Sequence, residues 1–405
     1  MRHLLSALLL ALPLAAWAQI TTLTEADAVR RGLAHPDLAD LESGSVESAR
    51  ADVLAAGMLP NPTLGYSRDQ YRGNLESTEE TWQLSQTFDV SGRRGLRREA
   101  AEVRVEASYA GNNLRRGELA AEIRRRFHET LFKQEAVRVT ETWTQRFSRI
   151  ERIVEKLARA GEASGYDRRR LAREQQTAEA RLNNEKADLD RASERLAALV
   201  GNSGKTAESV TGVLPPNAPP PLEEALSRLD RRPDLQVLSR RAEAADLEGR
   251  AAARGWVPDV TLGVGPKRID NGITRENATV FAVTIPLPVF DRQQAGEKRA
   301  AAEALNARGE LSFARARAEG DLRGLHRQVE RLVAASADYR TRAVGESAEL
   351  LRVAEAAYQG GESTLLELLD AYRGALEAEM TALDLEWKAR QARIDYDLLT
   401  GSVTE

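Results

Sequence analysis

Two acids late in the chain could do chemistry together. Glu367 and Asp370 stand three residues apart in a leucine-rich segment, TLLELLDA at 364–371. On a helix both carboxylates project from one face while the leucines occupy the others. Copies arranged around an axis would form a ring of acids that repels anions and concentrates cations. A solvated face at a helix start, where acids favour the helix dipole, explains the same residues. The residues alone leave both interpretations open.

Residues for enzymatic or metal chemistry are scarce elsewhere. The chain has 4 His, 3 Met and no Cys, and it contains no HExxH sequence, so it offers few soft metal ligands and no thiol nucleophile. We expect His128, beside Glu129, to be an exposed helical residue. The segment GVG at 263–265 lacks the third glycine of a nucleotide loop. We therefore expect no enzymatic activity, no catalytic, cofactor-binding or metal-binding residues, and no cofactor.

Composition and the N-terminus are typical of an exported protein. The 405 residues carry 58 Lys+Arg against 62 Asp+Glu, a balance that argues against a nucleic-acid partner. Residues 1–18 read as a cleavable signal peptide, with a basic start at Arg2, an apolar run from 4 to 16 and a small residue at Ala18. No later stretch reaches the ~18 to 20 apolar residues of a membrane-spanning helix. If the chain crosses a bilayer, it must do so with strands.

Long helices must position the two acids. The 14 prolines leave 63–214 and 289–405 empty, and both stretches are rich in Ala, Glu, Arg and Leu with apolar residues at helical spacing. We expect helical hairpins over about 91–200 and 293–400, the second with an unbroken first helix to about 359. A helix of about 70 residues is on the order of 100 Å long. The hairpin turns are expected at Gly161, Glu162, Gly361 and Glu362.

The chain reads as an internal duplication. HPDL at 35–38 matches RPDL at 232–235, and LPNPTLG at 59–65 matches VPDVTLG at 257–263. The offsets between the halves stay between 197 and 200 residues, which indicates a structural repeat. A proline-rich segment between the halves should be a semi-extended linker. The expected organisation is a signal peptide at 1–18, a first repeat at 19–211, the linker at 212–221 and a second repeat at 222–405.

Each repeat carries a strand pair before its hairpin. Apolar residues alternate with small or polar ones, as in the strands of an outer-membrane barrel, although a soluble sheet with one wet face has the same pattern. Arg68 and Arg268 fall on the apolar side, and we place them near the hairpin tips. Four strands cannot close a barrel, which needs about eight, so either helices cover the sheet or several copies share one barrel. The expected strands are 62–71, 79–90, 259–269 and 278–289.

The order of these parts resembles the TolC-like outer-membrane efflux channels, the outer membrane factors of tripartite efflux pumps, over essentially the whole mature chain. LPNP at 59–62, IPLPVFDRQQ at 285–294 and LELLDA at 366–371 look most like the cobalt-zinc-cadmium heavy-metal branch. The resemblance implies a mostly α fold with a small β part, in which a homotrimer shares a twelve-stranded β-barrel and a twelve-helix periplasmic α-barrel. It also implies the outer membrane of a Gram-negative bacterium, with membrane lipid around the barrel and helices reaching into the periplasm.

The resemblance assigns roles to single residues. Glu367 and Asp370 stand in the positions of a constriction ring, where the family usually has two Asp. Asp167 and Tyr358 match two members of a latch that holds the hairpins closed, but the arginine position of that latch holds Ser363.

Two neighbouring arginines, Arg168 and Arg169, are candidates to replace the missing one. The expected contacts with a periplasmic adaptor, or membrane fusion protein, are the hairpin turns at Gly161, Glu162, Gly361 and Glu362.

The expected function is a passive outer-membrane exit channel for heavy-metal cations or drugs, served by that adaptor and an inner-membrane pump of the resistance-nodulation-division type. One alternative is a periplasmic adaptor or another coiled-coil binding protein, which would have a single hairpin inserted into a small β domain. Another is a TolC-like duct for protein or peptide secretion, which shares the architecture.

Overall fold

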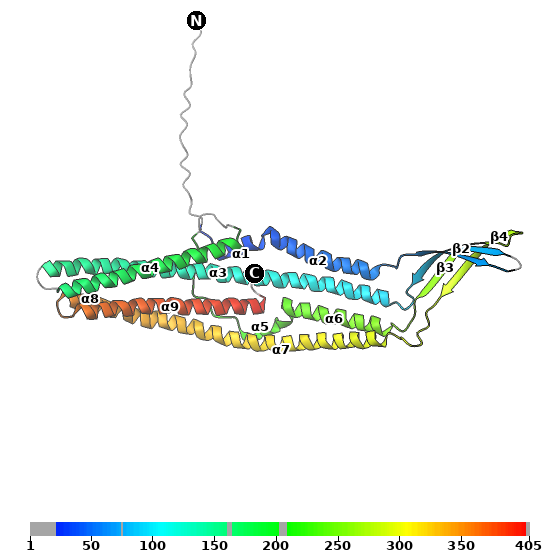
Figure 1. Cartoon of the computed structure of the whole chain (residues 1–405). Coiled ribbons are helices and arrows are strands. Elements are labelled where there is room, and N and C mark those ends of the chain that lie inside the picture. Colours follow the sequence, from blue (N-terminus) through cyan, green and yellow to red (C-terminus); the bar gives the residue numbers. More distant parts are fainter. Residues whose placement is uncertain (1–21, 74–75, 160–163, 202–208, 402–405) are drawn as a thin grey trace, which may run out of the picture. The chain divides into compact units, whose positions relative to one another are not determined.

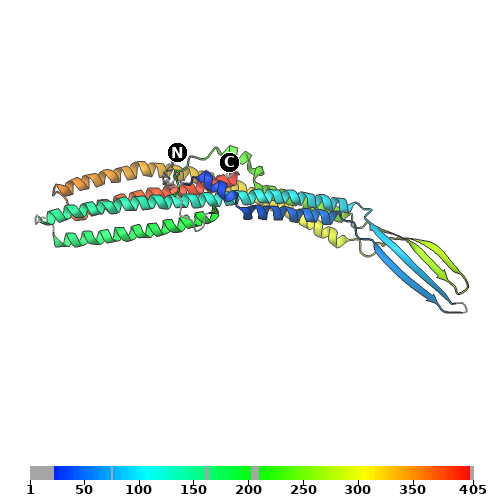
Figure 2. The ribbon, with the colours of Figure 1, turned by 90° about the horizontal axis from the view of Figure 1, so that it is seen from above.

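The computed structural model describes residues 22–73, 76–159, 164–201 and 209–401. The expected signal peptide at 1–18 and the first hairpin turn at Gly161 and Glu162 lie outside the described residues. The chain forms two compact units, which Figures 1 and 2 show from two sides. Unit 1 comprises Met1–Arg31, Ile123–Leu214 and Ala343–Leu383, and unit 2 comprises Gly32–Glu122, Pro215–Arg342 and Asp384–Glu405.

Helices make up most of both units. The helices are α1 (Glu25–Leu33), α2 (Pro36–Gly57), α3 (Arg93–Arg159), α4 (Gly165–Leu199), α5 (Leu222–Ser227), α6 (Pro233–Ala253), α7 (Gln294–Tyr339), α8 (Gly345–Gln359) and α9 (Leu365–Thr400). Two short turns of other helical types are η1 (Leu229–Arg231) and η2 (Arg340–Val344). The strands are β1 (Thr63–Tyr71), β2 (Ser77–Phe88), β3 (Val260–Asp270) and β4 (Arg275–Thr284). Among the described residues, no helix combines the length and the apolar character needed to cross a membrane.

In unit 1 the second half of α3 lies side by side with α4, α8 and the first half of α9 (Figures 1 and 2). The residues of α3 that recur every fourth position, Ile123, Phe127 and Leu131, are all buried. Leu171 of α4 and Leu369 of α9 are buried as well. Helical spacing of apolar residues therefore predicts the buried side of α3, because side chains four residues apart share one face.

His128, which the sequence analysis expects to be exposed, is buried in the structure. Only 1% of its surface is exposed, and its Nε2 lies 3.1 Å from Oε2 of Glu25 on α1. Its ring also packs edge-on against Phe127. The prediction of an exposed histidine is wrong because α1, which contacts α3 only in the folded chain, covers this side of the helix.

The duplication is visible in matching helix ends within unit 2. α2 and α6 each begin with Pro in the first turn, after an extended residue, His35 or Arg232. Such a Pro is favourable there because the first helical N–H needs no partner inside the helix. In both repeats the basic residue faces the acid two positions later: His35 lies 3.7 Å from Asp37, and Arg232 forks onto Asp234. The predicted tandem order of strand pair and long helical hairpin is confirmed.

The second hairpin differs from the expected unbroken helix to about 359. A π-helical turn, η2, separates α7 from α8. Its sequence, RTRAV, contains no Gly or Pro, so no helix-breaking residue within the turn predicts it. Arg340, the first residue of this turn, donates to Glu386 of α9 at 2.8 Å. A π-turn has i→i+5 hydrogen bonds and occurs mostly as a single-turn bulge inside an α-helix.

The four strands form one antiparallel sheet in the order β1-β2-β3-β4. Its register puts Leu64 opposite Leu84, Leu84 opposite Val264 and Val264 opposite Phe281. Cross-strand partners share a face, so these four apolar residues form one row on one side of the sheet. All four are exposed, from 45% for Val264 to 80% for Phe281.

β4 ends at Thr284, before the expected end at about 289. The residues that follow include Pro286 and Pro288, which have no N–H to donate to a neighbouring strand.

The part of the linker in unit 2 is held on α7 and α9. Arg393 donates to the carbonyls of Asn217 and Ala218 at 2.9 Å, and Arg390 donates to that of Pro215 at 3.0 Å. His326 Nε2 lies 3.1 Å from the carbonyl oxygen of a further proline, Pro220. The extended backbone carbonyls of the linker, which no regular element satisfies, thus find side-chain donors.

Candidate functional site

The helices that begin after the two hairpin turns carry matching caps. At the start of α4, Ser164 Oγ accepts from the N–H of Asp167 at 3.1 Å, and the Asp167 carboxylate accepts from the N–H of Ser164 at 3.2 Å. At the start of α9, Thr364 and Glu367 exchange the same bonds at 3.3 and 2.8 Å. Such reciprocal bonds satisfy backbone donors that the helix start leaves unpaired. Asp167 and Glu367, assigned to a latch and a ring, are therefore repeat equivalents that also cap helices.

Glu367 and Asp370 lie on the exposed side of α9. Both acids are exposed, whereas Leu368 and Leu369 between them are buried with 2% and 0% of their surface accessible. Asp370 forms no hydrogen bond or ion pair with another described residue. The structure thus brings the two acids together on one helix face and points them away from the core of unit 1.

In unit 1 Tyr358 lies within electrostatic reach of Asp167. Tyr358 of α8 is 8% exposed. Its burial, and then the negative charge of Asp167, raise the pKa of the Tyr358 hydroxyl. A tyrosine kept neutral in this way remains a hydrogen-bond donor at any physiological pH.

The resemblance expects an arginine at the position where this chain has Ser363. Ser363 Oγ is buried and has no hydrogen-bond partner in the part of the chain that the structure describes. Arg168 and Arg169 are exposed and form no ion pair with any described residue. The expected substitution by either arginine is therefore absent among the described residues.

An ion pair that sequence reasoning missed links the two hairpins instead. Glu174 of α4 accepts hydrogen bonds from Arg373 of α9 and, at 2.8 Å, from its neighbour Arg173. The Glu174 side chain is only 9% exposed. Burial alone would raise the pKa of Glu174, but the bonds from Arg373 and Arg173 outweigh burial and lower it. Arg and Glu are so frequent on these helices that spacing could not single out this pair.

A second missed link is aromatic. Tyr372 of α9 is 2% exposed and contacts the rings of Trp143 and Phe147 on α3, with centroids 5.4 and 5.6 Å apart. Its hydroxyl donates to Glu355 of α8. Burial and the Glu355 carboxylate raise the pKa of Tyr372. Three helices from both hairpins therefore meet at one buried tyrosine.

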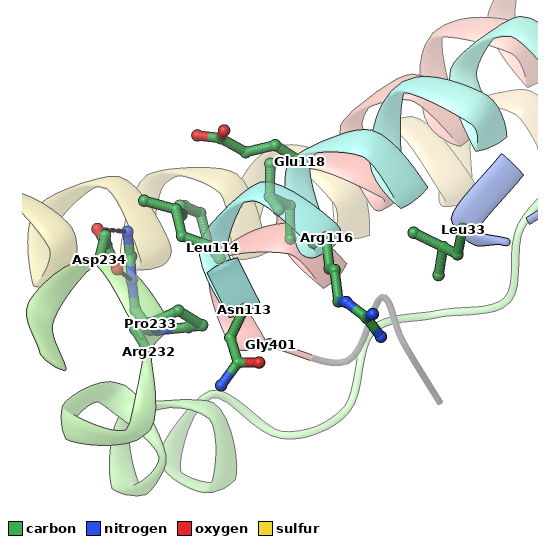
Figure 3. A pocket seen from close by; sticks show the side chains of 12 residues that line it. Leu33, Asn113, Leu114, Arg116, Glu118, Arg232, Pro233, Asp234 and Gly401 are labelled. Carbon is green, nitrogen blue, oxygen red and sulfur yellow. Dashed lines mark hydrogen bonds and ion pairs between the residues drawn. The ribbon is translucent and has the colours of Figure 1, made fainter. Parts of the chain in front are cut away.

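Unit 2 contains a cavity of about 660 Å³, shown in Figure 3. Its wall includes Asn113 and Arg116 from α3, and Arg232 and Asp234 at the start of α6. Arg232 forks onto Asp234 at 3.0 and 2.8 Å, and Arg116 forks onto Glu42 of α2 at 2.6 and 2.8 Å. Both arginines in the cavity wall are therefore paired with carboxylates of the same chain. In the described residues, no group of three or more His, Asp or Glu is arranged to hold a metal ion.

Comparison with known proteins assigns this architecture to a family. Residues 33–202 and 226–402 match the family model described as outer membrane efflux protein. The chain is 27% identical over 361 residues to the cobalt-zinc-cadmium resistance protein CzcC of Cupriavidus metallidurans, and the match covers 88% of this chain and 84% of that relative.

Solved structures share the fold. A crystal structure of CusC superimposes with a TM-score of 0.78 at 18% identity and covers 93% of this chain and 91% of that one. The open state of the Neisseria gonorrhoeae MtrE outer membrane channel gives a TM-score of 0.75 at 18% identity, over 94% of this chain and 89% of that one. The predicted TolC-like fold class is thereby confirmed.

The family model excludes one alternative from the sequence. A periplasmic adaptor would not match an efflux-channel model in both halves, so that alternative is wrong. Because the family model matches most of the chain, once in each repeat, the chain belongs to the outer membrane efflux protein family.

Proposed function

We propose that this chain is the outer-membrane exit channel of a tripartite efflux system. In this role it passively conducts substrate that an inner-membrane pump of the resistance-nodulation-division type delivers through a periplasmic adaptor. The observation that carries the proposal is the sheet, whose apolar face is exposed along all four strands. An exposed apolar face of this extent suits a lipid environment, because in water it would promote association.

Three copies would build the barrel. Four strands are too few to close on themselves, and the outer edges of β1 and β4 have free backbone groups for pairing with another chain. Three sheets joined edge to edge give a closed barrel of twelve strands with the apolar face toward lipid.

The test is the mass and location of the native protein. After cell fractionation and detergent extraction, we expect the chain in the outer-membrane fraction, with the mass of three chains and a heat-sensitive shift in gel mobility. A soluble periplasmic monomer would rule out the shared barrel and with it the channel.

The acids on α9 would line the periplasmic entrance. In a trimer, Glu367 and Asp370 from each copy would form a constriction ring that favours cations, and their exposure on one helix face supports this role. Asp167 and Tyr358 would belong to a latch between the hairpins, and the effect of the Asp167 charge on the pKa of the Tyr358 hydroxyl supports this role. Opening would then require the hairpin tips to move apart.

The hairpin turns would meet the adaptor. Gly361 adopts a φ of +74°, which glycine reaches without strain, and Glu362 beside it is exposed. We assign adaptor contact to this turn and to its repeat equivalent at Gly161 and Glu162.

The relatives indicate the substrate class. CzcC is named for cobalt, zinc and cadmium resistance, and NccC of Alcaligenes xylosoxydans xylosoxydans, 25% identical over 297 residues, for nickel, cobalt and cadmium resistance. We therefore propose divalent heavy-metal cations as cargo, in accord with a ring of carboxylates. Drugs are the competing cargo, and a tolerance assay separates the two.

A further inference from the structure

A row of charges interrupts the apolar face of the sheet. The register puts Arg68 of β1 opposite Glu80 of β2, and Glu80 opposite Arg268 of β3. Since cross-strand partners share a face, all three side chains lie on the side that carries Leu84 and Val264. Arg68 and Arg268 lie near the ends of their strands, toward the hairpin tips. We call Arg68, Glu80 and Arg268 the arginine row.

An aromatic pair lies directly beside the arginine row. Tyr66 is opposite Trp82, with ring centroids 4.7 Å apart, and both side chains are about half exposed. This pair is two residues from the arginine row along each strand, which is about 7 Å. Along the face, the side chains thus change from apolar to aromatic to charged toward the tips. In membrane proteins Tyr and Trp gather where hydrocarbon meets headgroups, so the arginine row would lie at headgroup depth.

The positive charge of the arginine row is only partly neutralised within the chain, so it can bind an anionic ligand. Arg68 lies 3.7 Å from Glu80, a long ion pair whose arginine side chain is 51% exposed, and Tyr66 also donates to Glu80 at 3.4 Å. Arg268 is exposed and forms no ion pair or hydrogen bond with another described residue. Asp270, the next acid on this face, is paired with Arg275 at 2.7 Å. Two guanidiniums against one carboxylate leave the row with net positive charge.

We infer that the arginine row binds the phosphate group of a lipid in the leaflet around the hairpin tips. Guanidinium forks match phosphate oxygens, and charge-assisted bonds of this kind are strong. The Tyr66–Trp82 pair packs against the start of the acyl chain. Glu80 positions Arg68, and Arg268 supplies a guanidinium that forms no hydrogen bond or ion pair with another described residue, although its charge also acts on Asp270. This inference rests on the proposed membrane barrel.

The opposite face of the sheet offers a control for the loss of a positive charge. Lys267 is the neighbour of Arg268 in β3 and projects from the other face, where its ammonium pairs with Glu79 at 2.6 Å. Removing its charge changes the net charge of the strand by the same amount as removing that of Arg268. A lipid that binds on the face of Arg268 should therefore bind the Lys267→Gln variant as tightly as it binds the wild type.

The experiment compares wild type, Arg68→Gln/Arg268→Gln and Lys267→Gln as detergent-extracted trimers. Native mass spectrometry with a phosphorylated lipid, the same lipid dephosphorylated, or inorganic phosphate separates the sources of binding. We expect the wild type and Lys267→Gln to retain the phosphorylated lipid and the double variant to bind it at least about tenfold more weakly.

Three results would overturn the inference: equal lipid retention in all three proteins, equal retention of the dephosphorylated lipid, or displacement by inorganic phosphate at an equal concentration. Failure of the proposed function gives a different result, because the wild type itself would then lack the trimer mass and the outer-membrane location. Heat-modifiable mobility of each variant shows that it has folded.

Discussion

Glu25 is a partly buried acid whose pKa is strongly changed by its neighbours. Burial alone would raise its pKa, but the hydrogen bond from His128 and the charge of Arg124 lower it to about 2 from an ordinary value of 4.5. A lowered pKa means that the folded state favours the charged carboxylate. The resulting stability is present above about pH 4.5 and is lost as the pH falls toward 2.

The variant Glu25→Gln should therefore destabilise the protein at pH 7. The difference in unfolding free energy between variant and wild type should decrease as the pH falls. The side chain is 29% exposed, so we expect a loss of about 2 to 3 kcal/mol at pH 7. Denaturant unfolding of wild type and variant at pH 7 and pH 3 measures the difference. An equal difference at both pH values would contradict the assigned pKa.

Among the glycines that the structure describes, Gly265 has the least room for a side chain. A Cβ there would lie 1.7 Å from the carbonyl oxygen of Trp82, which is backbone and cannot move without disturbing β2. Gly265→Ala should therefore cost about 1 to 3 kcal/mol and reduce the heat-modifiable form. Gly44→Ala is the control, because a Cβ at Gly44 meets nothing within 4 Å and α2 accommodates alanine well. Equal yields of the two folded variants would contradict the strand geometry.

At the scale of helices, Glu174 and Arg373 connect α4 to α9. Removing Arg373 leaves a largely buried carboxylate without its partner on the other hairpin. Because Arg373 is 48% exposed, we expect a loss of only about 1 to 2 kcal/mol from Arg373→Gln. In the reconstituted channel the same change should raise the resting conductance.

The charge-reversed pair Glu174→Arg/Arg373→Glu is the control for this link. It keeps opposite charges across the hairpins and should recover part of the closed-state conductance. A conductance that responds equally to the single variant and to the reversed pair would show that the ion pair does not hold the hairpins.

Ion selectivity tests the start of α9. The double variant Glu367→Gln/Asp370→Asn removes the proposed ring of charge. It still allows the helix cap to form, because the amide oxygen of the introduced glutamine also accepts the backbone bond. We expect the cation-over-anion permeability ratio to fall severalfold while the trimer stays folded. Glu349→Gln, on the exposed side of α8, is the control for losing an exposed carboxylate elsewhere on the chain. Unchanged ion selectivity would contradict the proposed ring and show that the two acids have only a structural role.

For the assembled channel, complementation in cells tests the proposed cargo. In cells that carry a cognate pump and adaptor but lack their own channel, this chain should restore tolerance to cobalt, zinc or cadmium. Gly265→Ala should restore less, because fewer barrels fold. Recovery of drug tolerance without metal tolerance would contradict the proposed cargo.

Local sequence patterns predicted the long helices, the strand pairs and the tandem repeat, and the order of these parts carried the resemblance that the family model confirms. Helical spacing marks Ile123 and Phe127 as buried, proline-free stretches allow very long helices, and alternation marks one face of each strand as apolar. Such patterns repeat many times along a chain of this kind, so a few local exceptions do not obscure them. The pairing of Asp167 with Ser164, and of Glu367 with Thr364, also follows from local capping chemistry.

Contacts between side chains on different elements became clear only from the folded chain. His128 is buried because α1 covers it, η2 separates α7 from α8, and Glu174 pairs with Arg373 on the other hairpin. Each outcome depends on which helix faces lie against each other, and one charged residue on an amphipathic helix is locally equivalent to its neighbours. The choice of partner is therefore made by packing, which no short segment of sequence contains.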